Sequence, residues 1–338
     1  MRKFIAIFAT LAMLCAVLTP ALAEGTIKRI GTLQMLNMSE QDYAAVQKLR
    51  AVAGEMLNGE NIPAENPYYD GMLDENPEII YFDSLNDMVM ALDANEIDAI
   101  DLNRSTAEYL CTLNDNLKIL MDYSDAEDNV LTDFVFNSLL SFDFSLMLPE
   151  GNQALADELS EALIAMEEDG TVDELAATYI DDVKGEVPAA EPASIDGAET
   201  LRVAVTGDLP PMDFVSSDGK PAGYNVAVLS EVGRRIARNI EFVPISASAR
   251  AMALSSGEVD VVFWSRSCMA AQEIIENGMD WRALFVPEDE ADRAMLEKID
   301  KTLVSSFDYV NYNTKDIPKG LVVTDRYYSD NIVLVAKK

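Results

Sequence analysis

The chain has 338 residues, with 59 acidic and 25 basic side chains, no histidine and a formal net charge of −34. Without histidine, Ser-His-Asp and Cys-His catalysis and metal sites with histidine ligands are excluded. So acidic a surface repels nucleic acid and anionic lipid, and we expect neither as a partner. The hydrophobic content of 49% is ample for the core of one large or two medium domains.

Residues 1–23 have the features of a secretory signal peptide. A basic start is followed by an apolar run over residues 4–18, and Ala21-Leu22-Ala23 forms a small-x-small cleavage site. Cys15 follows a leucine and lacks the small residue before it that a lipoprotein signal needs, so we expect no lipid anchor. No later stretch is apolar for long enough to cross a bilayer. The sequence predicts a protein that is secreted or periplasmic.

Strands and helices alternate along residues 27–138, which is typical of an α/β fold. A Pro/Gly-containing loop is expected over residues 58–76. The predicted strands are residues 27–35, 79–82, 97–102 and 117–121, and the predicted helices are residues 40–57, 85–92 and a helix starting at 106.

A strand over residues 144–148 is followed by two predicted helices, residues 153–167 and 172–180. Residues 185–199 are rich in Pro, Ala and Glu, have no periodicity and form a predicted linker. A second α/β run follows this linker. Its predicted strands are residues 201–205, 240–243, 321–323 and 331–336, and its predicted helices are residues 226–236 and 287–301.

One short phrase occurs twice. Residues 90–100 read Met-Ala-Leu-Asp-Ala-Asn-Glu-Ile-Asp-Ala-Ile, and residues 252–262 read Met-Ala-Leu-Ser-Ser-Gly-Glu-Val-Asp-Val-Val. Each copy predicts a helix that ends at a residue suited to left-handed geometry, Asn95 or Gly257, followed by a buried strand. Two such copies indicate two α/β lobes built alike, with a ligand cleft between them. The alternative is that helix–turn–strand phrases recur by chance.

Two cysteines remain after the signal peptide, Cys111 and Cys268. They follow the two copies of the repeated phrase at similar distances, so we place them in different lobes. A disulfide between them would tie the lobes together, and we therefore expect two free thiols.

From residue 201 onward the chain resembles extracellular solute-binding proteins that deliver polar amino acids to ABC transporters. The segments that carry the resemblance are 201–205 (Leu-Arg-Val-Ala-Val), 208–214 (Asp-Leu-Pro-Pro-Met-Asp-Phe), 218–226 and 253–260. They match the opening of lobe one of that family in order and spacing. The resemblance implies a two-lobed α/β fold of the periplasmic-binding-protein type II class, with an interlobe cleft, a hinge, no cofactor and a monomeric state.

Residues 27–138 resemble lobe two of the same family, and residues 139–184 resemble its return hinge strand and closing helices, which we expect to pack on lobe one. Lobe one would then span residues 200–338, and the strand near its end resembles the family's first hinge strand. The order of lobe two, closing helices, linker and lobe one is a circular permutation, which close chain termini permit. The alternative is two degenerate binding domains in tandem.

Family members that bind α-amino acids use a lobe-one arginine for the carboxylate and a lobe-two aspartate for the amine. These positions fall near Gln272 and on Asn103 here, so both charges are absent. The resemblance also marks Asp98 and Asp260 as structural positions rather than an acid–base pair. We therefore do not carry amino-acid specificity over to this chain.

Other residues near the predicted cleft are candidates for ligand binding. Arg266, expected in a loop just past the lobe-one strand, has a guanidinium suited to a carboxylate or phosphate, although a surface salt bridge is an equal alternative. Asp101 and Asn103 lie at a lobe-two strand end, where α/β proteins bind ligands. The candidates are Arg266, Ser265, Ser267, Asn103, Asp101, Asp208, Met212 and Ser39, the last of which is also a candidate helix cap.

The predicted function is capture of a small polar or anionic solute, amino-acid-like, between two lobes for uptake by an ABC transporter permease. One alternative is a sensing or interaction module that has lost transport, which the two missing charges keep open. Another is a dehydratase-like enzyme on the same fold, but no residue here matches the acid that such an enzyme needs. No metal ligand is predicted.

Overall fold

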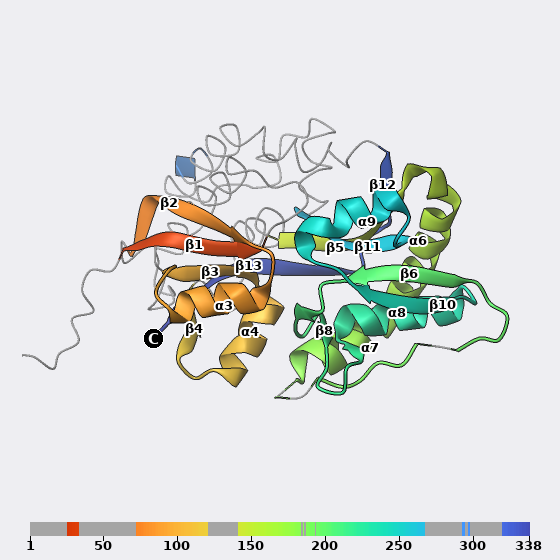
Figure 1. Cartoon of the computed structure of the whole chain (residues 1–338), viewed down its shortest axis with the longest axis horizontal. Helices are drawn as coiled ribbons and strands as arrows, with labels where there is room; N and C mark the ends of the chain where they lie inside the picture. Colours follow the sequence, from red (N-terminus) through yellow and green to blue (C-terminus); the bar gives the residue numbers. More distant parts are fainter. Residues whose placement is uncertain are drawn as a thin grey trace, which may run out of the picture.

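The computed structural model describes residues 26–33, 72–120, 141–183, 185, 187–192, 194–267, 293–294, 297 and 320–338. They form two groups of strands and helices that lie side by side, and the long strand β13 (Tyr328–Lys337) runs through both (Figure 1). We call the group built from residues 27–120 lobe two, and the group built from residues 141–267 and 320–331 lobe one. The predicted α/β class is confirmed.

Lobe two is built on a parallel set of strands in the order β2-β1-β3, extended by β13, which is antiparallel to β3. Its helices contribute Leu85, Met88 and Leu92 to a core that includes Ile100 of the sheet. Its elements are β1 (Ile27–Leu33), β2 (Leu73–Phe82), α3 (Leu85–Asp93), β3 (Ala99–Asn103), α4 (Arg104–Leu113) and β4 (Leu117–Ile119).

Lobe one has the parallel strands β10-β6-β11 and, beside them, β5, which is antiparallel to both β11 and β13. A small sheet, β7-β8-β9, comes directly before helix α8. Its elements are β5 (Ser141–Pro149), η2 (Glu150–Asn152), α6 (Gln153–Glu168), α7 (Thr171–Ala176), η3 (Ala177–Asp181), β6 (Thr200–Val205), β7 (Asp208–Leu209), β8 (Asp213–Val215), β9 (Pro221–Ala222), α8 (Tyr224–Arg235), β10 (Asn239–Pro244), η4 (Ala247–Ala249), α9 (Arg250–Ser256), β11 (Val261–Ser267) and β12 (Leu321–Val323).

The largest core lies in lobe one and includes the helices α6 and α7. Leu159, Leu163 and Met166 are spaced so that they share one face of α6, and all three are buried. They belong to the same apolar cluster as Val203 of β6 and Val226 of α8. Helices α6 and α7 therefore pack against the part of the chain that follows the linker.

The two copies of the repeated phrase have the same hydrogen bonds. In lobe two, the amides of Asn95, Glu96 and Asp98 donate to Leu92, Ala91 and Arg29, at 3.1, 2.9 and 2.9 Å. In lobe one, the amides of Gly257, Glu258 and Asp260 donate to Leu254, Ala253 and Arg202, at 3.1, 3.0 and 2.8 Å. Asn95 (φ 58°) and Gly257 (φ 73°) both adopt the left-handed geometry that the sequence predicts.

The repeat extends to one ion pair in each lobe. Asp98 is 2.7 Å from Arg29, and Asp260 is 2.8 Å from Arg202, with each aspartate also accepting the amide of its arginine. Burial raises the pKa of Asp98 and Asp260, but the hydrogen bonds from arginine outweigh it and hold both pKa values below the ordinary value. Both carboxylates thus have a structural partner in this protein.

Strand β2 begins earlier than expected. Residues 73–76, predicted as the end of a loop, belong to β2, which pairs with β1 after an irregularity in register near Arg29. Strand β1 pairs with Leu73 and then with Glu78, so residues 74–77 form an irregular stretch of the strand, and this long-range pairing has no local sequence signal. The predicted helices at residues 40–57 and 287–301 lie wholly or almost wholly outside the described residues, as does Cys268.

Gly223 is a position where only glycine fits. Its φ is 109°, and a Cβ atom there would lie 2.5 Å from the carbonyl oxygen of Met212. We predict that Gly223→Ala lowers the free energy of unfolding by about 2 kcal/mol or more, because backbone strain and a backbone clash add together. Urea denaturation checks this. Gly219→Ala is the matched control: its φ is 80° with no atom within 4 Å, so it should cost only about 1 kcal/mol. Equal effects would contradict the clash.

Candidate functional site

Strand β13 crosses the boundary between the lobes. Its residues 328–331 pair with β5 of lobe one, and its residues 332–335 pair with β3 of lobe two. Because one unbroken strand is hydrogen-bonded on both sides, the step from Asn331 to Ile332 is the described point where the chain passes between lobes. Figure 1 shows this strand running through both halves.

The loop of residues 206–213 in lobe one contacts two helices of lobe two. The carboxylate of Asp208 accepts hydrogen bonds from the amides of Leu85 (2.9 Å) and Asn86 (3.5 Å), at the start of α3. A carboxylate there is favoured because the first amides of a helix have no partner within the helix. Met212, which is buried, accepts a hydrogen bond from the Ser105 hydroxyl of α4 at 3.5 Å.

A buried hydrogen-bond network fixes the shape of this loop. The carboxylate of Asp213 accepts hydrogen bonds from the Thr206 side chain and from Asn225, the latter at 2.9 Å. Asn225 in turn accepts the hydroxyl of Tyr327 at 2.8 Å. Burial raises the pKa of Asp208, and the nearby charge of Asp213 adds to this rise. The loop therefore brings two carboxylates to the interlobe boundary.

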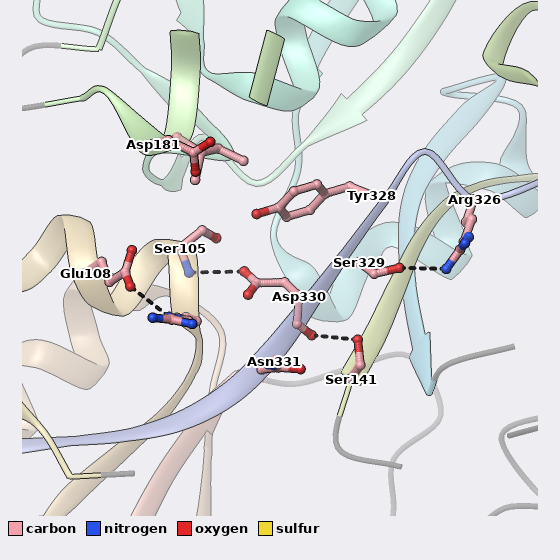
Figure 2. Close-up of a pocket in the computed structure, with 11 residues that line it drawn as sticks. Ser105, Glu108, Ser141, Asp181, Arg326, Tyr328, Ser329, Asp330 and Asn331 are labelled. Atoms are coloured by element: carbon pink, nitrogen blue, oxygen red, sulfur yellow. Dashed lines mark hydrogen bonds and ion pairs between the residues drawn. The ribbon is translucent and has the colours of Figure 1, made fainter. Parts of the chain in front are cut away.

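A pocket of about 550 Å³ lies between the lobes beside β13 (Figure 2). Helix α4 of lobe two forms one wall, the end of η3 in lobe one forms another, and β13 runs along the base. Its lining residues are Arg104, Ser105, Glu108, Ser141, Ile180, Asp181, Arg326, Tyr328, Ser329, Asp330 and Asn331.

Most charges in this pocket have protein partners. Arg104 pairs with Glu108 at 2.7 Å, and Arg326 donates to Ser329 at 3.1 Å and lies 3.6 Å from Asp143. The carboxylate of Asp330 accepts the Ser105 amide, at the start of α4, at 3.0 Å. The ion pairs of the pocket therefore lie within one lobe or the other, and the contact of Asp330 with Ser105 joins the two lobes.

Asp330 is the most perturbed carboxyl of the pocket. Burial raises its pKa to about 6, although the hydrogen bonds from Ser105 and the charge of Arg104 oppose the rise. Asp330 and Asp208 have the same role, since each is a carboxylate on the lobe-one side that caps a helix of lobe two.

The structure places several predicted site residues at the boundary. Asn103 ends β3 and lies at the N-cap of α4, and its side-chain amide nitrogen is buried without a partner. Asp101 is buried within β3, where it stands opposite Leu334 of β13. Asp208 and Met212 make the cross-lobe contacts described above. Ser39 and Gln272 lie outside the described residues.

The expected position of Arg266 is wrong. Strand β11 continues through Ser267, so Ser265, Arg266 and Ser267 lie in a strand rather than in a loop. Antiparallel pairing with β5 extends the strand and sets Arg266 opposite Asp143. The sequence alone does not contain this pairing, because β5 comes more than a hundred residues earlier.

Sequence reasoning missed Arg250, the first residue of α9. The register of the repeat sets Arg250 in the position of Met88, which is fully buried. The signal available in the sequence was an arginine at a position where the other copy of the repeat has a methionine. In the structure Arg250 is partly exposed, and the carboxylates of Asp208 and Asp213 lie close enough for their charges to act on it.

Two features of other protein classes are not found in the described part of the chain. No helix there is long and apolar enough to cross a membrane. Among the same residues, no group of three or more Cys, Asp or Glu side chains is arranged to hold a metal ion.

Cys111 is a free thiol whose pKa is raised by burial.

Residues 201–270 match the family of bacterial extracellular solute-binding proteins, family 3. This part of the chain, which begins at β6 and contains the loop 206–213, is similar to that family, which is extracellular by its description. The resemblance found in the sequence from residue 201 onward is confirmed. No curated protein matches the chain.

Several solved structures match the chain at low sequence identity. The ligand-binding component of an ABC-type import system from Staphylococcus aureus, with zinc bound, is 11% identical with a TM-score of 0.38; the match covers 91% of this chain and 65% of that one. The GluR0 ligand-binding core from Nostoc punctiforme, in complex with L-glutamate, is 8% identical, with 92% and 84% coverage and a TM-score of 0.33. A phosphate-binding protein from Streptococcus pneumoniae is 12% identical, with 93% and 90% coverage and a TM-score of 0.32.

The raised pKa of Asp330 predicts a pH dependence of stability. A carboxyl with a raised folded-state pKa stabilises the fold below its unfolded value of about 4, and this contribution is lost as the pH rises through about 6. We predict that Asp330→Asn removes this loss, so that between pH 4 and pH 7 the variant gains about 2 kcal/mol relative to the parent protein. Urea unfolding across this range measures it, with exposed Asp325→Asn as the control. A difference that does not change with pH would contradict the prediction.

Proposed function

We propose that this protein is an exported solute-binding protein that captures a small polar or anionic solute, amino-acid-like, between its two lobes and presents it to an ABC transporter permease. The observation that carries the proposal is the position of the loop 206–213. This loop lies inside the family-matched segment, and its Asp208 and Met212 reach across to helices of the other lobe. A solute held beside such a loop would contact both lobes at once.

The hinge geometry supports capture by closure. The described crossing between lobes is a single strand, and the contacts beside it include hydrogen bonds to helix starts and apolar contacts of Leu209 and Tyr109 with the core of the other lobe. Such contacts can break and re-form at small cost. Binding of a solute to both lobes then shifts the molecule toward the closed state.

We also propose that the chain is a circular permutation of the family's usual order. Supporting this, α6 and α7 share a core with β6 and α8, which come after the linker. The end of β13 supports it as well, since it pairs with β3 and β4 of the lobe that begins the chain. In this arrangement residues 185–199 join the family's natural end to its natural start.

The solute-binding proposal predicts a ligand-dependent thermal shift. Purified protein, unfolded and refolded to remove any bound solute, is screened against the proteinogenic L-amino acids, small organic acids and neutral sugars. At least one solute should raise the melting temperature, because a ligand that binds only the folded state stabilises it. If none of these solutes shifts the melting temperature, the proposal of a solute-binding protein fails.

We predict that Asp208 stabilises the closed arrangement of the two lobes. Asp208→Ala leaves the amides of Leu85 and Asn86 without their cross-lobe partner, a loss of about 0.5–2 kcal/mol. Because this contact exists only when the lobes touch, we expect the affinity for the best solute of the screen to fall about 2- to 30-fold. Small-angle scattering of the variant without solute should show a larger radius of gyration. Asp218→Ala, an exposed lobe-one carboxylate, is the control. An unchanged radius and affinity would show that the contact does not contribute to closure.

A further inference from the structure

Asp330 is a buried carboxylate beside the point where the chain crosses between the lobes. It is the residue before Asn331, at which the pairing of β13 with lobe one ends. Its side chain points toward the start of α4 in lobe two (Figure 2). Only 7% of Asp330 is exposed, although the residue lines the interlobe pocket. Opening of the lobes would therefore change the surroundings of this carboxylate.

The contact of Asp330 with lobe two is made to a backbone amide. Its carboxylate accepts the Ser105 amide at 3.0 Å. Ser105 lies in the first turn of α4, where amides have no acceptor within the helix. Asp330 is thus the acceptor of this amide, and it can serve as one only while the two lobes touch.

The arginines near Asp330 pair with other carboxylates. Arg104 lies 2.7 Å from Glu108, and Arg326 lies 3.6 Å from Asp143. The negative charge of Asp330 is therefore balanced by the start of α4 and, at longer range, by the charge of Arg104. The charged or titratable side chains around Asp330 are Arg104 and Glu108 of α4, Asp143 of β5, Asp181 of η3, Tyr328 of β13 and Arg326 just before β13.

The closed arrangement accommodates the neutral carboxyl at lower cost than the charged one. Burial without a paired cation disfavours a carboxylate, and it raises the pKa of Asp330 to about 6 against the opposing effects of Ser105 and Arg104. A carboxyl in water has a pKa of about 4. After protonation, the group keeps a carbonyl oxygen that can accept the Ser105 amide. Closure thus does not need the charge.

We infer that closure of the two lobes takes up a proton at Asp330, so that an acidic medium favours the closed arrangement that holds the solute. The inference rests on the proposed function, in which the lobes open and close, and it adds a regulation of that movement. Opening exposes Asp330 to water, where the charged form is stable and the proton is released. Solute is then held more tightly in an acidic medium than in a neutral one.

The two protonation equilibria set the pH window. The proton binds more tightly in the closed state (pKa about 6) than in the open state (pKa about 4), so closure gains as the pH falls from about 7 to about 4. The ratio of closed to open molecules should rise about tenfold between pH 7 and pH 5.

A second carboxylate adds to this dependence. Asp208 also accepts amides of a lobe-two helix, and burial raises its pKa. Its charged neighbours are Asp87, Asp213 and Arg250. Asp330→Asn should therefore remove about tenfold of the response between pH 7 and pH 5, and a further Asp208→Asn change should remove the remainder.

The Ser105 amide reports the contact directly. Its hydrogen exchange is measured in the purified protein without solute between pH 5 and pH 7, and its protection is corrected for the intrinsic pH dependence of exchange. The parent should show at least about tenfold higher protection at pH 5 than at pH 7. The Asp98 amide, whose acceptor is Arg29 of the same lobe, is the reference for unfolding of lobe two. The exposed Asp325→Asn is the control variant.

The outcomes are distinct. Protection of Ser105 that rises on acidification in the parent, and about tenfold less in Asp330→Asn, supports the inference. An equal response in both proteins overturns it, as does a fall on acidification, which would mean that the charge of Asp330 holds the lobes together. Exchange of Ser105 at the rate of Asp98 also overturns it, because the lobes then do not open on their own.

Two safeguards keep the test decisive. If Asp330→Asn does not fold, Asp330→Ser replaces it, since a serine hydroxyl removes the titration and is small enough for the site. The exchange measurement needs no solute. A solute screen without any binder therefore refutes the proposed function and leaves the proton linkage to be decided by the Ser105 amide.

Discussion

The structure depends on one strand that is hydrogen-bonded to both lobes. Residues 328–331 of β13 complete the sheet of lobe one, and residues 332–335 complete that of lobe two. Because a strand without its neighbours would leave backbone amides and carbonyls unpaired, neither sheet is complete without β13. The lobes are therefore joined by backbone hydrogen bonds at this strand.

Two carboxylates cross the boundary in the same way. Asp208 and Asp330 lie on the lobe-one side, and each accepts amides at the start of a lobe-two helix. Burial raises the pKa of both carboxyls, because desolvation disfavours their charged form. The hydrogen bonds from the amides of the helix start oppose this rise. Contacts of this kind tie a loop and a strand of lobe one to the starts of two lobe-two helices.

The two lobes share a repeated helix–turn–strand unit. The turn hydrogen bonds and the Arg–Asp pairs coincide in both copies, since they stabilise the same geometry. The copies differ at Arg250, which is partly exposed at a position where the other copy has the buried Met88.

The sequence by itself determined the α/β class, most element positions, the two left-handed turns and the repeat, because these follow from local periodicity and from residues such as Gly257. Through a family resemblance, the sequence also named Asp208 and Met212 as candidate ligand-binding residues. Only the tertiary structure placed β2 from Leu73 and Arg266 within β11, since both depend on strands distant in sequence. The surroundings of Arg250 were likewise decided in three dimensions, because only packing buries its Nε without a hydrogen-bond partner and brings the charges of Asp213 and Asp208 near it.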